Sequence, residues 1–307
     1  MSQSKKLNLK WLTVLAIFTT LVLWASAFVG IRAGLKEFSP FHLALFRYLV
    51  ASVTLLGVSL IKKIRLPDRQ SIFRLALAGI IGIGAYNIAL NFGEQSVTAA
   101  SACFIINTVP IITSIFSVIF LKERINLWGW IGRLVSFVGV SLIVFGESSG
   151  ITLSIGIVVI FIAALFHGTF IIIQKPLLRK YTSFEVTAYS IWFGMLALLP
   201  FIGGLLWRIQ NASSEALMSI GYLGVFPGVI AYLCWAYVLS GTSASKASSY
   251  LFFIPMLVIV IGWTWLGEIP PVIALIGGLV AISGVGITRF RKTNELDTCT
   301  KVVGLKS

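Results

Sequence analysis

Two stretches of the sequence decide the fold, FLKERINLWGWIG at residues 120–132 and WLGEIPPVIALIG at residues 265–277. Both place a glutamate two residues after a leucine, and both end on a glycine in the same register. In the first stretch the glutamate is flanked by Lys122 and Arg124, whereas the second stretch has no cation at all. The pattern indicates two copies of one element, of which the second has lost its flanking charges.

The composition around these stretches predicts an all-α integral membrane protein. Of the 307 residues, 58% are hydrophobic and 11% are charged, whereas soluble proteins carry about a quarter charged residues. Apolar runs of roughly 20 residues, enough for a helix to cross a hydrocarbon core of about 30 Å, recur along the chain. The runs do not alternate with period two, and they predict ten transmembrane helices at residues 11–31, 41–61, 72–91, 99–120, 127–145, 153–173, 184–206, 216–238, 247–266 and 271–290.

The basic residues set the expected orientation. The net charge is +14, but the lysines and arginines fall in short clusters between apolar runs, so we expect membrane topology signals and no nucleic-acid partner. Nearly all of them lie on one side, which predicts a cell-membrane protein with cytoplasmic tails at residues 1–10 and 291–307. The first run resembles a secretory signal with a small-residue site at 25–27. We interpret it as a membrane span because it has a counterpart in the second half.

An internal repeat accounts for the two opening stretches. At an offset of 145 residues Pro110 matches Pro255, and Gly139 matches Gly284. The repeat predicts two domains, 11–145 and 153–290, with five spans in each. An odd number of spans forces the second copy to enter the membrane upside down, so its counterpart of the Lys-Glu-Arg loop faces outside, where cations oppose the topology. Inverted repeats of this kind are typical of secondary transporters.

The chain resembles the EamA-type ten-span permeases of the drug/metabolite transporter superfamily. The matching features are Trp24 to Phe28 (WASAF), Pro40 with Phe46-Arg47-Tyr48, and the two elements that run from Pro110 to Gly139 and from Pro255 to Gly284. The resemblance extends from about residue 11 to residue 290. It implies a central cavity surrounded by spans one, three, four, six, eight and nine, and it leaves the substrate open among amino acids, nucleobases and other metabolites.

Polar and aromatic residues in the middle of those spans are the candidates for substrate binding. A small metabolite needs a few placed hydrogen bonds and apolar surfaces to stack on. An alternative for each is hydrogen bonding between helices or anchoring at the membrane interface. The candidates are Trp24, Ser26, Tyr86, Asn87, Asn91, Ser101, Asn107, His167, Tyr232, Trp235, Ser248 and Tyr250.

A second group is expected to act in gating or in structure, and consists of Arg47, Pro110, Glu123, Pro255 and Glu268. Arg47 is either half of an ion pair with Glu94 or an anchor. The two glutamates are either alternating gates or caps on backbone groups at tight turns. The prolines interrupt helical hydrogen bonding, for gating or for static packing. Arg133 departs from the family pattern, and His167 is either a protonation site or a neutral hydrogen-bonding residue.

The inverted repeat predicts a secondary transporter, and the resemblance implies export of small metabolites such as amino acids or related compounds as the first expectation. An importer or exchanger of nucleobase-type or nucleotide-type metabolites is the alternative. No GxxxxGK[ST], HExxH or GxSxG motif is present, which disfavours ATP hydrolysis and an intramembrane enzyme, and the short loops disfavour a receptor. We expect no cofactor and no metal. The expected partners are a small-molecule substrate and the lipid bilayer, with the oligomeric state left open.

Overall fold

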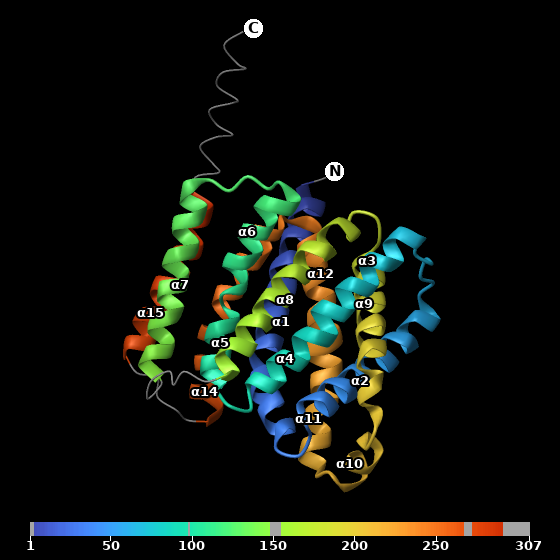
Figure 1. Ribbon diagram of the computed structural model, residues 1–307. Coiled ribbons are helices and arrows are strands. Elements are labelled where there is room, and N and C mark those ends of the chain that lie inside the picture. Colours follow the sequence, from blue (N-terminus) through green and yellow to red (C-terminus); the bar gives the residue numbers. More distant parts are fainter. Residues whose placement is uncertain (1–2, 98, 148–154, 267–271, 291–307) are drawn as a thin grey trace, which may run out of the picture.

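The structure is a computed structural model, which describes residues 3–97, 99–147, 155–266 and 272–290. These residues form helices and their connections (Figure 1). The first half holds α1 Gln3–Leu35, α2 Pro40–Ile61, α3 Arg69–Gly79, α4 Tyr86–Gly93, α5 Ala99–Ile106, α6 Val109–Leu121 and α7 Leu127–Glu147. The second half holds α8 Ile155–Leu177, α9 Ser183–Leu198, α10 Leu205–Asn211, α11 Ser214–Val225, α12 Ala231–Gly241, α13 Ala244–Ser248, α14 Ile254–Leu266 and α15 Val272–Phe290.

The helices are long and apolar enough for a multi-pass membrane protein. Among the described residues, seven helical stretches meet the length and hydropathy needed to cross a bilayer. Of the other three predicted spans, 127–145 falls on α7 and 271–290 on α15, whereas 247–266 is divided among α13, a 3₁₀ turn and α14. Two helix boundaries differ from those predicted from the sequence. α1 already begins at Gln3, within the predicted tail, and the run 184–206 is broken after Leu198 by a 3₁₀ turn that contains a proline.

The helices begin where the sequence supplies a cap. Ser39 precedes Pro40, and its side chain accepts a hydrogen bond from the His42 amide at the start of α2. At the start of α9, Thr182 and Glu185 form a capping box in which each side chain accepts a hydrogen bond from the other residue's backbone amide. These caps set the residue at which each helix begins, which the apolar pattern alone does not specify.

The two halves are interleaved. α1 packs against α11 and α12, α2 packs against α9 and α11, and α4 and α6 both pack against α8. Figure 1 shows α1 and α8 in the middle of the bundle, with α7 and α15 together at one side. The cluster of buried apolar residues therefore draws its members from both halves of the chain.

α7 and α15 make a close and reciprocal contact. A Cβ atom on Gly139 would lie 2.3 Å from the Ala281 nitrogen, and one on Gly284 would lie 2.4 Å from the Ser136 nitrogen. Ser136 Oγ also donates a hydrogen bond to the Ala281 carbonyl at 2.9 Å. Gly284 and Ala281 are the repeat counterparts of Gly139 and Ser136, so the same contact is made twice, with the two halves exchanging places. Small residues at these positions let the two backbones approach closely.

The link between the start of α3 and the end of α8 gives a pH-dependent prediction. The Asp68 carboxylate accepts hydrogen bonds from Lys180, Tyr181 and Ser71, and these lower its pKa below the ordinary value of 3.8, with Lys180 the largest cause. The group therefore stabilises the fold above pH 3.8, and this contribution disappears as the pH falls toward the folded-state pKa.

We expect Asp68→Asn to lower the melting temperature of the detergent-solubilised protein by the same amount at pH 7 and pH 5. Asparagine is also a good helix N-cap, so the change tests the charge and not the cap. Below pH 4 the two melting curves should converge. Equal melting temperatures of the wild type and Asp68→Asn at pH 7 would show that this exposed ion pair contributes nothing to stability, which is the case for many surface pairs.

Candidate functional site

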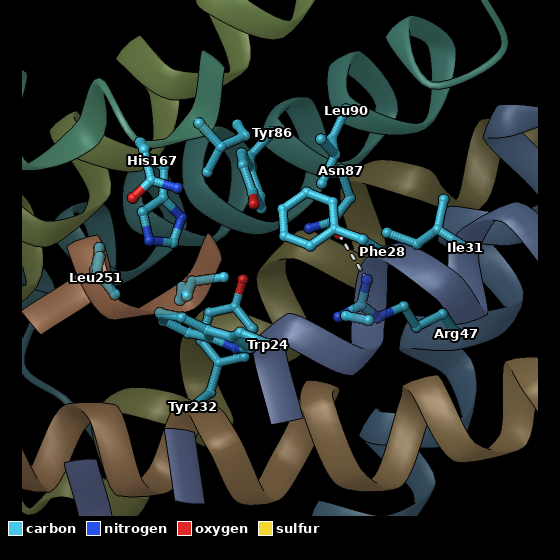
Figure 2. A pocket seen from close by; sticks show the side chains of 14 residues that line it. Trp24, Phe28, Ile31, Arg47, Tyr86, Asn87, Leu90, His167, Tyr232 and Leu251 are labelled. Carbon is cyan, nitrogen blue, oxygen red and sulfur yellow. Dashed lines mark hydrogen bonds between the residues drawn. The ribbon is translucent and has the colours of Figure 1, made fainter. Parts of the chain in front are cut away.

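A cavity lies in the middle of the bundle, where both halves contribute its walls (Figure 2). The wall residues come from α1, α2, α4, the end of α5, α8, α12 and the segment that leads into α14. They are Trp24, Ala27, Phe28, Ile31, Arg47, Tyr86, Asn87, Leu90, Ile106, Asn107, His167, Tyr232, Leu251 and Ile254. Apolar and aromatic side chains form most of the surface, and a few polar groups interrupt it, as is usual for small-molecule sites.

Aromatic rings form one side of this cavity. The Trp24 ring centroid lies 5.4 Å from that of His167 and 5.4 Å from that of Tyr232, both in edge-to-face geometry. The Tyr86 ring lies 4.8 Å from His167. Figure 2 shows these side chains converging from helices of both halves. His167 Nδ1 is buried and has no hydrogen-bond partner among the described residues, so an acceptor or donor position there stays unused.

A polar cluster forms the other side. Arg47 Nη1 donates to Asn87 Oδ1 at 3.1 Å, the bond drawn dashed in Figure 2. The Asn87 amide nitrogen in turn donates to Tyr48 OH and to the Ile83 carbonyl, both at 2.9 Å. These bonds orient the amide oxygen toward the guanidinium. Asn87 therefore holds Arg47 in place, and the cluster is fixed before any ligand arrives.

The predicted ion pair between Arg47 and Glu94 is not formed. Both side chains are buried, but within the described residues no carboxylate lies within 4.0 Å of Arg47. Neither carboxylate oxygen of Glu94 has a hydrogen-bond partner there. The reason is that Asn87, seven residues and about two turns before Glu94, already occupies the position opposite the guanidinium.

Both proline-containing spans are interrupted beside the cavity. α5 ends at Ile106, and Pro110 lies in the first turn of α6. Asn107 sits in the gap, where its side-chain oxygen is buried without a partner. In the second half a 3₁₀ turn at Ser249–Phe253 leads into α14, of which Pro255 is the second residue. Each proline thus starts a helical segment, where its missing amide hydrogen costs least. A role in gating stays a prediction.

π-helical turns occur at equivalent places in the two halves. Ile80–Ala85 joins α3 to α4, and Phe226–Ile230 joins α11 to α12. Only the second contains a proline, Pro227. In the first, a Cβ on Gly82 would lie 2.3 Å from the Phe170 ring, so this position has no room for a side chain. π turns are uncommon and concentrate at functional sites. Here they directly precede the cavity residues of α4 and α12.

Half of the predicted binding residues do not line the cavity. Ser26 hydrogen-bonds with Tyr222 OH at 2.7 Å, and Asn91 donates to the Pro40 carbonyl at 3.0 Å, so both connect helices. The Trp235 ring lies behind Trp24, with centroids 5.4 Å apart. Ser101, Ser248 and Tyr250 also lie outside the lining. The prediction in turn missed the apolar wall residues, which are Ala27, Phe28, Ile31, Leu90, Ile106, Leu251 and Ile254. Of these, only Ala27 and Phe28 had a signal in the sequence, because they belong to the WASAF stretch.

The remaining candidates connect the halves away from the cavity. The Glu123 carboxylate accepts hydrogen bonds from the Ala244 amide at 2.7 Å and from the Ser245 amide and hydroxyl at 3.1 and 2.6 Å. It thereby caps the first turn of α13, which belongs to the other half. Arg133 Nη2 donates to the Ser245 carbonyl at 2.9 Å, and its Nη1 donates to a carbonyl one turn earlier in α7. Glu268 lies outside the described residues.

The EamA-like transporter family model matches residues 11–145 and 154–290. The chain belongs to the EamA-like transporter family. This agrees with the resemblance of the WASAF and Pro-Glu-Gly elements, and it makes the chain a membrane transporter. No group of three or more potential metal ligands occurs within the residues that the structure describes.

Several relatives of this EamA-like transporter are known by name. The uncharacterized transporter YdfC of Bacillus subtilis (strain 168) is 40% identical, over 90% of each chain. A protein of Streptantibioticus cattleyicolor named "Probable terminal-alkyne amino-acid exporter" is 35% identical, over 91% of this chain and 93% of the relative. The uncharacterized inner membrane transporter YedA of Escherichia coli (strain K12) is 26% identical over 82% of each chain.

A protein of known crystal structure shares the fold of this EamA-like transporter. It superposes with a TM-score of 0.72 at 16% identity and covers 90% of this chain and 96% of its own.

Proposed function

We propose that this transporter exports amino acids or closely related small metabolites by alternating access across the cytoplasmic membrane. The observation that carries the proposal is the central cavity, whose walls come from both halves of the chain. A cavity between two halves can open to either side when the halves rock against each other. The aromatic walls and the few fixed polar groups fit a small ligand with one charged end and an apolar part.

We further propose that ten spans form two inverted five-helix halves with both termini in the cytoplasm. The reciprocal contact of α7 with α15 supports this arrangement. Gly132 faces Gly284, and their repeat counterparts Gly277 and Gly139 face each other in the same way. Contacts that exchange in this manner are those of a two-fold axis. Since the residue numbers rise along α7 while they fall along α15, the axis lies across the helices, and the second half is inverted relative to the first.

The proposed direction of transport and the proposed amino-acid class rest on the relative from Streptantibioticus cattleyicolor that is named "Probable terminal-alkyne amino-acid exporter". That name describes the relative, and it supports a class of substrate and not one compound.

The test therefore uses a panel of candidate substrates. Liposomes that contain the purified protein are loaded separately with each of the common amino acids, with the terminal-alkyne amino acid propargylglycine, or with a nucleobase. The efflux of each compound is then measured. Efflux of nucleobases alone would overturn the amino-acid proposal, and so would the absence of efflux for every compound in the panel.

Trp24→Ala should reduce the efflux of the best substrate about tenfold, because it removes the ring that contacts both His167 and Tyr232. A tenfold change corresponds to about 1.4 kcal/mol, which is in the range of one lost aromatic contact. Trp11→Ala is the matched control, since Trp11 lies on the same helix with 67% of its surface exposed. Equal efflux from the two variants would contradict the assignment of this cavity as the transport site.

A further inference from the structure

Arg47 is an unbalanced cation in the wall of the cavity. Of the 14 residues that line the space, it is the only arginine or lysine, and no aspartate or glutamate is among them. Its residue surface is 4% exposed. A charge buried within a membrane protein is costly unless it is paired, and arginines in such positions are therefore suspected of function.

The hydrogen bonds of Arg47 leave donors free. A guanidinium has five N–H donors, and Nη1 uses one of them toward Asn87 Oδ1 at 3.1 Å. Nε is buried without a partner. Among the described residues, no hydrogen bond of Nη2 is found either, although Tyr48 lies beneath the guanidinium with its ring 5.3 Å away. Figure 2 shows the side chain reaching from α2 into the space beside Asn87 and Phe28.

The second buried arginine of the bundle shows how a structural one is held. Arg133 donates from Nη1 to the Gly129 carbonyl at 2.6 Å and from Nη2 to the Ser245 carbonyl at 2.9 Å. Its Nε is buried without a partner, as that of Arg47 is, so the two arginines differ at Nη2. Arg133 is not part of the cavity wall. Both arginines are 4% exposed, and the difference between them therefore lies in their partners and not in their burial.

We propose that Arg47 binds the carboxylate of the transported substrate. A guanidinium matches a carboxylate in shape and can donate two parallel hydrogen bonds to it, and such a ligand would neutralise the charge that the protein leaves unpaired. Asn87 acts as the positioning residue, since it holds Nη1 while Nη2 and Nε stay available. The assignment rests on the proposed function, and it narrows the substrates to compounds with a free carboxylate.

The rest of the cavity suits the remainder of an amino acid. Asn107 Oδ1 is buried and without a partner, and His167 Nδ1 is likewise. Both can accept a hydrogen bond from an ammonium group. The faces of Trp24 and Tyr86 add surfaces that attract a cation as well as apolar groups. A zwitterion therefore finds both a donor and acceptors in the wall of the same space.

The test compares an amino acid with its primary amide, in which an uncharged group replaces the carboxylate and the ammonium group is kept. The best-transported amino acid of the panel and its primary amide are each loaded into liposomes that contain wild-type protein, Arg47→Gln or Arg133→Gln. Hydrogen bonds to charged groups are worth about 1.5–3 kcal/mol, so the wild type should prefer the acid over the amide by about 10- to 100-fold. Arg47→Gln should lose this preference through loss of acid efflux, while it keeps amide efflux. Arg133→Gln should keep the preference.

Each outcome decides a separate point. If the wild type transports the acid and Arg47→Gln still prefers it over the amide, the carboxylate assignment is overturned and the proposed function stands. If the wild type transports neither compound, the proposed function itself fails. Should Arg47→Gln transport nothing, calorimetric titration of the purified variant with acid and amide decides. Equal affinities support the assignment, and a retained preference for the acid overturns it.

Discussion

Gly139→Leu is expected to separate α7 from α15 and to destabilise the protein by about 3 kcal/mol or more. The new Cβ would lie 2.3 Å from the Ala281 nitrogen and 2.6 Å from the Gly277 carbonyl oxygen. Both are backbone atoms, so the clash cannot be relieved by a change of rotamer, and one helix has to move. Overpacking of a core usually costs 1–3 kcal/mol, and a shift of a whole helix against its partner places the cost at or above the top of that range.

The matched control is Gly286→Leu on α15, where a Cβ would meet nothing within 4 Å. Both changes replace glycine by leucine in an apolar helix, so they share the gain in helix propensity and differ in packing. Thermal unfolding in detergent and the fraction of monodisperse protein after purification measure the effect. If the two variants melt together, the close approach of α7 and α15 does not exist in the membrane protein.

Glu123→Ala should give the second large effect, a loss of about 2 kcal/mol together with reduced transport. The carboxylate receives three hydrogen bonds from the first turn of α13, and hydrogen bonds to charged groups contribute about 1.5–3 kcal/mol. A negative group at this end also complements the helix dipole. Because the loop after α6 belongs to one half and α13 to the other, the loss acts on the junction between the halves.

Glu123→Gln provides the control, since its amide oxygen can still accept one of the bonds without the charge. Its melting temperature should fall between those of the wild type and Glu123→Ala. The same variants separate the two interpretations of this residue. A static cap predicts that efflux falls in proportion to stability, whereas a gate that opens in each cycle predicts that efflux changes even at temperatures where all three proteins are fully folded.

The positions of the helices could be predicted from the sequence because apolar runs and caps are local signals. The described parts of all ten predicted ranges fall on helical segments. The repeat was visible because proline and glycine are rare enough in matched positions to stand out. α1 shows the limit. It is apolar around its whole circumference, so periodicity could not indicate which of Trp24 and Ser26 faces the cavity. Trp24 does, whereas Ser26 pairs with Tyr222.

The partners of the buried charges could not be predicted either. Arg47 and Glu94 are on neighbouring spans and of opposite sign, which favours an ion pair on sequence grounds alone. The outcome depends on which face of α4 turns toward α2, and Asn87 took the place of the acid. A contact between helices is decided by rotation about the helix axis, and the sequence of a uniformly apolar helix carries little information on that rotation.

The two π turns directly affect the rotation of α4 and α12 about their helix axes. A π turn takes up one residue more than the α-helical turn it replaces, and one residue corresponds to about 100° around the axis. Deleting Ile81 from the turn at Ile80–Ala85 would let α3 run on into α4 as one regular helix. Tyr86 and Asn87 would then swing away from the ligand space although every side chain had been kept. The number of residues in the two π turns, and not only side-chain identity, thus sets which side chains of α4 and α12 line the cavity.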